Sequence, residues 1–457
     1  MNHTPTPQPL SLGKKIIFAL GQLGWSLASY APGMLLVYFY LPPDTGTPVF
    51  PQRIHQGAIF GILTLIGLAY GAGRLFDAIT DPLVAGMSDR CKSPLGRRRK
   101  YLAVSFLPFS LFSLLVFLPP APGYSVLNSV WVFAGIIIFY WFMTMYVTPY
   151  FAMMSELSHT PDDRLFLSTL ISITWALGTA IGSQVYAIKG AFEGMGMGAT
   201  QAFQTTVAIF AGVGALFMLL PIIFIDENKY SKQEPNNEKI YEALVSALKN
   251  RNFRLFTISD LAYWVAITIA STGLVYYVTI LLGLKESFTS FLQIVMFGLS
   301  FLFYIPTNII ARKTGKKRLL NIAFVLFILV YAYILFLGKL PLGAEVQAYL
   351  VVIMMAIPLA VFGILPNAII GDISEADAKE SGHHKTAIFY GARTFMSKLG
   401  QMVGGLIFPS LLLLGSTPQN DIGVRLTGIA AIVFVVIGLV FFLRYDEKKI
   451  LETLEQK

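Results

Sequence analysis

The chain has 457 residues, of which 55% are hydrophobic and 13% are charged, and its formal net charge is +9. An ordinary soluble domain carries about 25% charged residues, so this composition excludes a set of soluble domains. The single cysteine, Cys91, excludes a disulfide framework and any metal centre built from several cysteines.

Twelve apolar runs are long enough to cross about 30 Å of hydrocarbon, which takes roughly 20 helical residues. The runs lack the alternation of barrel strands, so they predict an all-α polytopic membrane protein. The first run is longer than the core of a signal peptide and is therefore predicted to be a true span. In chain order the predicted spans lie near residues 15–41, 56–88, 101–120, 127–155, 165–190, 200–225, 255–283, 287–311, 319–338, 345–371, 386–414 and 422–443.

Basic residues are distributed unequally between alternate loops. Most lie in the tails and in the loops that share a side with them, and the positive-inside rule then predicts that both termini are cytoplasmic. The positive charge therefore orients a protein of the cell (inner) membrane and does not indicate nucleic-acid binding.

The longest polar interruption falls after the sixth span. It predicts an N-terminal six-helix bundle over residues 1–225, a cytoplasmic linker over 226–254, and a C-terminal six-helix bundle with a tail over 255–457. Basic, glycine-containing turns follow the second span of each half, at Gly86–Lys100 and Ala311–Arg318. This similarity predicts two parallel repeats.

The linker contains an amphipathic pattern. Ile240, Leu244 and Leu248 recur every four residues and predict a short helix. Such a helix either lies on the membrane face or packs on the ends of the bundles, and the sequence leaves both interpretations open.

The second span carries charged residues on one face. Tyr70, Arg74, Asp77 and Asp81 follow at spacings of four, three and four residues, which places them on one side of a helix. A charge near the bilayer centre costs at least about 2.5 to 3.5 kcal/mol, so such residues are candidates for function. At roughly 1.5 Å per residue, Asp77 lies ~18 Å from the cytoplasmic end, and Lys398 of the eleventh span lies equally deep.

These charges predict a site for a coupling ion. Two carboxylates one turn apart, with the hydroxyls of Thr80 and of Thr144 from the fourth span, suit a small hard cation or a proton. A lysine at the same depth competes for the anionic site, which makes Lys398 the predicted counter-charge. In the alternative interpretation, Arg74 and Asp77 form a self-neutralising pair, which leaves the second carboxylate and the lysine unexplained.

Other features give weaker signals. Asp260 in the seventh span is either a second titrating group or a helix-end cap, and Arg393 also lies inside a predicted span. The chain has no catalytic triad, zinc motif, P-loop or dinucleotide fingerprint, so neither enzyme activity nor a cofactor beyond the coupling ion is expected. The aromatic residues proposed for a cavity wall are Trp25, Tyr150, Phe151 and Trp175.

The loop between the second and third spans allows two interpretations. Its basic residues either only orient the chain or latch the cytoplasmic ends of the bundles when the cavity faces outward. Helix-end acids would be the partners of such a latch. The predicted gate comprises Asp89, Arg90, Arg98, Arg99, Glu156, Asp372 and Glu375.

Two long stretches resemble a known family. They read RLFDAITDPLVAGMSDRCKSPLGRRRKYL (Arg74–Leu102) and DISEADAKESGHHKTAIFYGARTFMSKLG (Asp372–Gly400). Both are similar to signatures of the glycoside-pentoside-hexuronide:cation symporters, the melibiose-permease branch of the major facilitator superfamily. In the second stretch Ser381 and His384 are substitutions. The resemblance implies the major facilitator fold, with 12 transmembrane helices in two six-helix bundles.

The resemblance also implies roles for individual residues. It makes Asp77 and Asp81 carriers of the coupling cation, Lys398 the counter-charge, Arg74 a charge partner on helix two and Thr144 a possible cation ligand. The roles of Asp77, Asp81 and Lys398 are those that the depth argument reached independently.

The chain departs from melibiose-type members at the sugar ligands. Where such members carry an acid on helix one, an acid on helix four and an arginine on helix five, this sequence has Ser26, Val147 and Ser172. A galactoside-like substrate is therefore disfavoured. A less polar glycoside remains compatible with hydrogen bonding and stacking by Gln22, Ser26, Tyr150, Ser172 and Trp175. Thr80 replaces an asparagine of sodium-using members, which favours a proton over sodium.

The sequence thus predicts a secondary active transporter that moves a small solute, with a sugar or glycoside favoured, in symport with H+ or Na+ by alternating access. A monomer in the lipid bilayer is expected. One alternative is a lysolipid symporter of the same fold, and another is a non-transporting receptor or scaffold. The intact buried charges argue against a scaffold.

Overall fold

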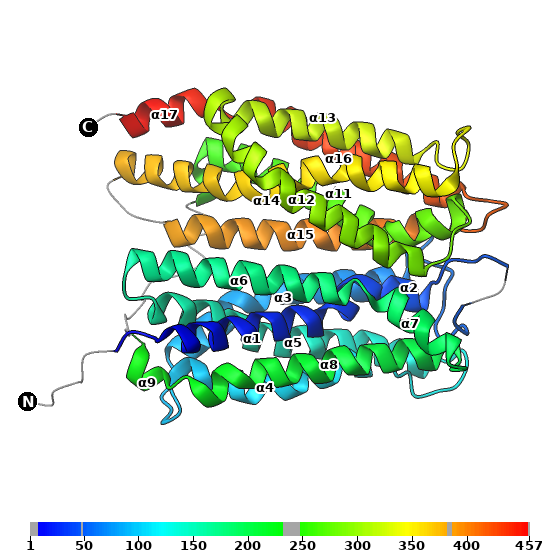
Figure 1. Cartoon of the computed structure of the whole chain (residues 1–457), viewed down its shortest axis with the longest axis horizontal. Coiled ribbons are helices and arrows are strands. Elements are labelled where there is room, and N and C mark those ends of the chain that lie inside the picture. Colours follow the sequence, from blue (N-terminus) through cyan, green and yellow to red (C-terminus); the bar gives the residue numbers. More distant parts are fainter. Residues whose placement is uncertain (1–7, 47–48, 232–246, 382–385, 456–457) are drawn as a thin grey trace, which may run out of the picture. The chain divides into compact units, whose positions relative to one another are not determined.

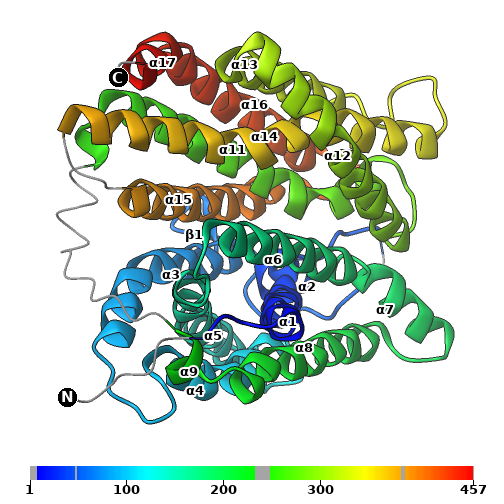
Figure 2. The ribbon, with the colours of Figure 1, turned by 60° about the vertical axis from the view of Figure 1, so that its left-hand side comes forward.

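The computed structural model describes residues 8–46, 49–231, 247–381 and 386–455. These residues form two compact units: one from Met1–Tyr40, Phe50–Gln56 and Phe76–Asn237, the other from Leu41–Val49, Gly57–Leu75 and Glu238–Lys457. Each is a bundle of long helices (Figures 1 and 2). The predicted linker helix falls largely on residues 232–246, which lie outside the described residues.

The first unit contains the following elements, with α3 shared between the units. They are α1 (Leu12–Tyr30), η1 (Ala31–Leu35), α2 (Leu36–Tyr40), α3 (Leu65–Asp89), α4 (Arg97–Leu115), α5 (Val126–Leu157), α6 (Pro161–Gly182), α7 (Val185–Gly194), α8 (Ala199–Phe224) and α9 (Glu227–Tyr230). In the second unit a two-residue hairpin, β1 (Ala58–Ile59) and β2 (Leu63–Thr64), precedes α3.

The helices of the second unit follow in chain order. They are α11 (Arg251–Tyr276), η2 (Tyr277–Leu281), α12 (Ser287–Thr314), α13 (Lys316–Ile334), α14 (Ala344–Ser381), α15 (Thr386–Leu412), α16 (Ile422–Leu443) and α17 (Glu447–Glu455). The first part of α3 belongs to this unit, where Gly67 packs against Pro409 and Gly71 against Leu406 of α15.

The all-α prediction is confirmed, whereas twelve spans remain a prediction. In the described part of the chain, eight helices are long and apolar enough to cross a membrane. The helices α1, α3, α4 and α15 are long but do not meet that criterion. Charged residues explain the difference: Arg-Arg-Arg-Lys opens α4, Lys14 and Lys15 lie in the first turn of α1, and ionisable residues interrupt α3 and α15.

The two units are built in the same way. In the first, α1 packs on α8 where Gly24 meets Gly214, so a Cβ at Gly24 would lie 2.6 Å from the Gly214 oxygen. In the second, α11 packs on α16, where a Cβ at Gly438 would lie 3.2 Å from the Ser259 oxygen. Both α1 and α11 continue into a π-helical segment. The two units share these features, and the parallel repeat expected from the sequence stays a prediction.

The basic turns also match. Gly96 has φ of +104° and Gly315 has φ of +86°, a left-handed region that only glycine adopts readily, and a basic helix follows each. A glutamate accepts hydrogen bonds from the first N–H groups of each helix, Glu227 for α4 and Glu447 for α13. A carboxylate is favourable there because the helix N-terminus is positive.

Candidate functional site

Two carboxylates of α3 meet two threonines of α5 inside the first unit. The Thr144 hydroxyl donates to Asp77 Oδ1 over 2.8 Å, and the Thr148 hydroxyl donates to Asp81 Oδ1 over 3.0 Å. Asp77 is fully buried at 0% exposure, whereas Asp81 is partly buried. The hydroxyl oxygens of Thr80 and Thr144 lie 3.4 Å apart. We call these five residues the acid pair site.

Helical periodicity explains the pairing. Asp77 and Asp81 are four residues apart on α3, as Thr144 and Thr148 are on α5, so each acid faces its own threonine. The sequence argument identified Thr144 but missed Thr148. The sequence did carry a signal for Thr148: it follows Thr144 by one helical turn, just as Asp81 follows Asp77 by one turn.

The composition of the site restricts the ion that it suits. Among the described residues no group of three or more His, Cys, Asp or Glu side chains is placed to hold a metal ion. Two carboxylates with neutral hydroxyl oxygens form an oxygen-rich site, which suits a small hard cation or a proton.

The basic residues named with the acids lie in the second unit. Arg74 Nε donates to the Tyr70 hydroxyl over 3.4 Å, and the Tyr70 ring lies against Gly405 of α15. Lys398 is on α15 and is partly buried.

The proposed cavity residues of the first unit fall into two groups. Trp175 is 47% exposed and Phe151 39% exposed, the ring of Trp25 meets Phe151 edge-on, and Ser172 is also exposed. These four residues can meet a ligand without repacking of the bundle.

The other three cavity candidates are buried. Tyr150 stacks on Phe18 and donates to its carbonyl oxygen, while Ser26 donates within α1 to Leu23. Gln22 is buried on α1 as well. In the described structure these three side chains are therefore packing residues of the bundle.

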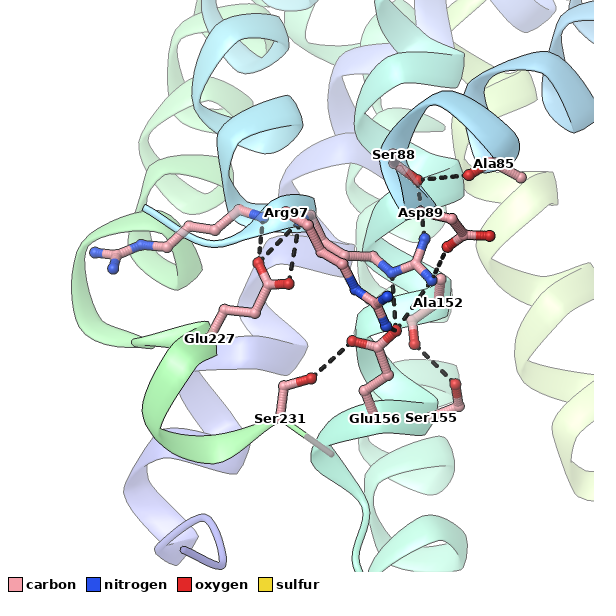
Figure 3. A network of polar contacts seen from close by, with 11 residues as sticks. Ala85, Ser88, Asp89, Arg97, Ala152, Ser155, Glu156, Glu227 and Ser231 are labelled. Carbon is pink, nitrogen blue, oxygen red and sulfur yellow. Dashed lines mark hydrogen bonds and ion pairs between the residues drawn. The ribbon is translucent and has the colours of Figure 1, made fainter. Parts of the chain in front are cut away.

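A second polar cluster joins the end of α3 to α4 and α5 (Figure 3). Arg98 contacts Glu156, Asp89 and Ser88, with Nε 3.0 Å from Glu156 Oε1 and Nη1 2.8 Å from Ser88 Oγ. Arg97 Nη2 donates to the same Glu156 oxygen over 2.7 Å. These residues form the arginine network, and all of them belong to the first unit.

Glu227 joins this cluster from α9. It is fully buried, and its carboxylate accepts from the backbone N–H of Arg98 and of Arg99 at the start of α4. Burial raises the pKa of Glu227 above its usual range, although the two N–H bonds act in the opposite direction. Sequence reasoning missed Glu227, because its distance from the loop along the chain gives no local signal.

The predicted gate residues have different surroundings in the two units. In the first unit, Arg98 pairs with both Asp89 and Glu156, and Arg90 is exposed. In the second, Asp372 pairs with Lys316, and Glu375 is exposed. The latch between bundles therefore remains a prediction, while the arginine network within one bundle is observed.

Replacing Arg98 with alanine is expected to destabilise the first unit strongly. Arg98 is buried and contacts two carboxylates, and removing one partner of a buried ion pair costs about 3 to 5 kcal/mol. Thermal unfolding of the purified protein measures the effect. Arg90→Ala is the control, because Arg90 is an exposed arginine between α3 and α4. Equal unfolding temperatures for the two variants would show that the network is energetically unimportant.

The second unit holds an ion pair that sequence reasoning did not assemble. Arg393 of α15 donates from Nε to Asp260 Oδ2 over 2.9 Å and from Nη2 to Oδ1 over 3.2 Å. Asp260 is therefore neither a helix-end cap nor an isolated acid. Both residues lie inside predicted spans, but their pairing depends on how α11 and α15 are rotated.

The chain is similar to known membrane transporters. A family model described as MFS/sugar transport protein matches residues 17–445. The inner membrane symporter YicJ of Escherichia coli K12 is 23% identical over 78% of this chain and 76% of its own length. The isoprimeverose transporter of Lactiplantibacillus pentosus is 23% identical over 79% of this chain and 75% of its own.

A shorter match has a different substrate in its name. The sodium-dependent lysophosphatidylcholine symporter 1 of Xenopus tropicalis is 29% identical, over 40% of this chain and 32% of its own length.

Solved structures share the fold. The nucleoside transporter NupG, as its D323A mutant, matches with a TM-score of 0.68 and 15% identity over 95% of this chain and 100% of its own. A D-xylose-proton symporter matches with a TM-score of 0.66 and 14% identity over 95% and 96% of the two chains.

Proposed function

The chain belongs to the MFS/sugar transport protein family, and on that premise we propose that it is a cation-coupled symporter of a small solute, with a sugar or glycoside as the favoured substrate. Members of this family and the named relatives are membrane transporters and not enzymes. Transport would proceed by alternating access of two six-helix bundles, with both termini in the cytoplasm and a monomer as the working unit.

The acid pair site carries this proposal. A fully buried carboxylate inside a transporter costs free energy that a purely structural role would not require. Thr144 and Thr148 supply hydroxyl oxygens beside Asp77 and Asp81, which is the oxygen-rich environment that a proton or Na+ needs. We therefore assign coupling-ion binding to this site, with Thr80 completing it.

We propose Lys398 as the counter-charge on the basis of helix geometry. Lys398 precedes Gly405 by seven residues and Asp77 follows Tyr70 by seven residues, two turns in each case. Gly405 contacts Tyr70, and in the expected topology the second and eleventh spans run in opposite directions. The equal number of helical turns therefore supports our proposal that Lys398 and Asp77 lie at the same depth.

The substrate proposal rests on the relatives and on the exposed aromatic residues. The isoprimeverose transporter is named for a small saccharide, and aromatic side chains such as the exposed Trp175 and the half-buried Trp25 suit the apolar face of a sugar ring. We place the substrate beside Trp25, Phe151, Ser172 and Trp175.

Reconstituted vesicles provide the test. The purified protein is placed in vesicles, and uptake of labelled isoprimeverose or D-xylose is measured with an imposed pH gradient, an imposed Na+ gradient or neither. Accumulation that one gradient drives, and that equal ion concentrations abolish, is the expected result. Equal uptake under all three conditions would exclude coupled symport.

A lysolipid is the second candidate substrate, because the lysophosphatidylcholine symporter matches part of this chain. The exposed aromatic and aliphatic side chains of α6 also suit an acyl chain. Labelled lysophosphatidylcholine in the same vesicles decides between the two. Gradient-driven movement of the lysolipid without movement of either sugar would replace the sugar assignment.

A further inference from the structure

The ion pair between Asp260 and Arg393 is distinct from the acid pair site. Both of its members lie well inside the ends of their helices, Asp260 about 13 Å along α11 and Arg393 about 10 Å along α15. Two hydrogen bonds join the carboxylate to Nε and Nη2 of the guanidinium. This two-point geometry fixes the plane of the guanidinium and balances its charge.

A third helix contributes to the same cluster. Arg393 Nη1 donates to Asn367 Oδ1 of α14 over 2.7 Å. Tyr390, one turn before Arg393 on α15, donates from its hydroxyl to the backbone oxygen of Asn367 over 2.9 Å. The guanidinium therefore has Asp260 on one edge and Asn367 on the other, and Tyr390 contacts Asn367.

The two edges differ in exposure. The side chain of Asp260 is 1% exposed and that of Arg393 is 15% exposed, whereas Asn367 is exposed and Tyr390 is 37% exposed. The cluster is thus closed at the carboxylate and open at the amide and the phenol. A ligand can reach Asn367, Tyr390 and the Nη1 edge of Arg393, but not Asp260.

The open edge has hydrogen-bonding capacity left. A guanidinium carries five N–H groups, and the hydrogen bonds to Asp260 and Asn367 use three of them within the described part of the chain. The carboxamide Nδ2 of Asn367 adds two more donors beside them, and the Tyr390 oxygen can accept. Donors, an acceptor and an aromatic ring therefore lie together.

A purely structural role explains this arrangement poorly. The helices α11 and α15 already pack closely where Gly400 meets Leu261 and Gly404 meets Val265, so no ion pair is needed to hold them together. Neutralisation of Arg393 requires only Asp260. Neither helix packing nor neutralisation of Arg393 requires an exposed amide and an exposed phenol at the outer edge of the cluster.

We propose that Arg393, Asn367 and Tyr390 form a recognition site of the second unit for an uncharged ligand rich in hydroxyl or ring oxygens. Asp260 is a positioning residue that holds the guanidinium and cancels its charge. Since the pair is neutral, the site offers hydrogen-bond donors without attracting an anion. The inference rests on the proposed transport function and identifies the substrate class as neutral saccharides.

Asn367→Ala is the sharpest test, because it removes the ligand-facing amide and leaves the pair between Asp260 and Arg393 intact. Uptake kinetics of isoprimeverose and D-xylose are measured in vesicles for the parent and the variant. We expect the KM to rise about tenfold or more with little change in maximal rate, since lost hydrogen bonds to a ligand weaken its binding.

Asn308→Ala is the matched control. Asn308 is also an exposed asparagine of the second unit, and its amide donates to the backbone oxygen of Tyr304 within its own helix. This variant is expected to keep the parental KM. An unchanged KM in Asn367→Ala, in vesicles where the parent transports the sugar, would refute the recognition site and leave coupled symport standing.

Competition by charged ligands tests the predicted neutrality. D-glucose and D-glucuronate differ by one carboxylate, and each is added against labelled isoprimeverose. Inhibition by glucose that is at least about tenfold stronger supports a neutral site, because burying an unpaired carboxylate is costly. Stronger inhibition by glucuronate would overturn the uncharged class. If the parent moves no sugar at all, the sugar symport proposal and this inference fail together.

Discussion

Replacing Asp77 with asparagine is expected to abolish uphill accumulation of substrate while leaving the protein folded. Asparagine has nearly the same shape and retains an acceptor for the hydroxyl of Thr144, so the packing of α3 on α5 is preserved. It carries no negative charge and takes up no proton, so the ion gradient no longer drives the substrate. Without that coupling, the accumulation ratio in vesicles should fall to about one.

A measurement of sugar binding distinguishes a variant that has lost coupling from one that has lost its folded structure. The Asp77→Asn variant should still bind sugar, since the carboxylate is assigned to the ion and not to the ligand, and it should equilibrate sugar down a gradient. The Asp81→Asn variant is expected to behave in the same way, because Thr148 donates a hydrogen bond to Asp81 as Thr144 does to Asp77.

Asp44→Asn serves as the control for charge removal. The exposed carboxylate of Asp44 accepts a hydrogen bond from the backbone N–H of Gly46, which an asparagine also accepts. Accumulation should be unaffected. If both Asp77→Asn and Asp81→Asn still accumulate substrate, the coupling ion binds elsewhere, and Asp260 is the next carboxylate to replace.

Replacing Lys398 with alanine should uncouple transport in a different way. In the proposed cycle the lysine neutralises the carboxylates after the ion has left, which lets the empty carrier return across the membrane. Alanine leaves the empty site with uncompensated negative charge, so net uptake should stop. Exchange of internal for external substrate needs only the loaded carrier and should persist.

Counterflow measurements separate these steps. Vesicles loaded with unlabelled sugar should take up labelled sugar through Lys398→Ala at a rate close to that of the parent, while their net accumulation is lost. Lys398→Arg, which keeps a positive charge, should recover part of the accumulation. Parental accumulation by Lys398→Ala would contradict the assignment of Lys398 as the counter-charge.

The sequence by itself was sufficient for the broad assignment. Apolar runs of transmembrane length specify helices because lipid leaves the backbone no other partner, and the all-α membrane fold is confirmed. The spacing of Asp77 and Asp81 placed both acids on one face, and the stretch that begins at Arg74 identified the family. These conclusions depend on local periodicity and on contiguous motifs, which a sequence displays directly.

Tertiary structure decided which side chains meet. Thr148 on Asp81, Glu227 at the start of α4, and Arg393 between Asp260 and Asn367 all join residues that are far apart in sequence. Such pairs depend on the rotation and axial offset of one helix against another. Close glycine contacts such as Gly24 with Gly214 set that rotation through packing, and hydrophobic periodicity does not encode it.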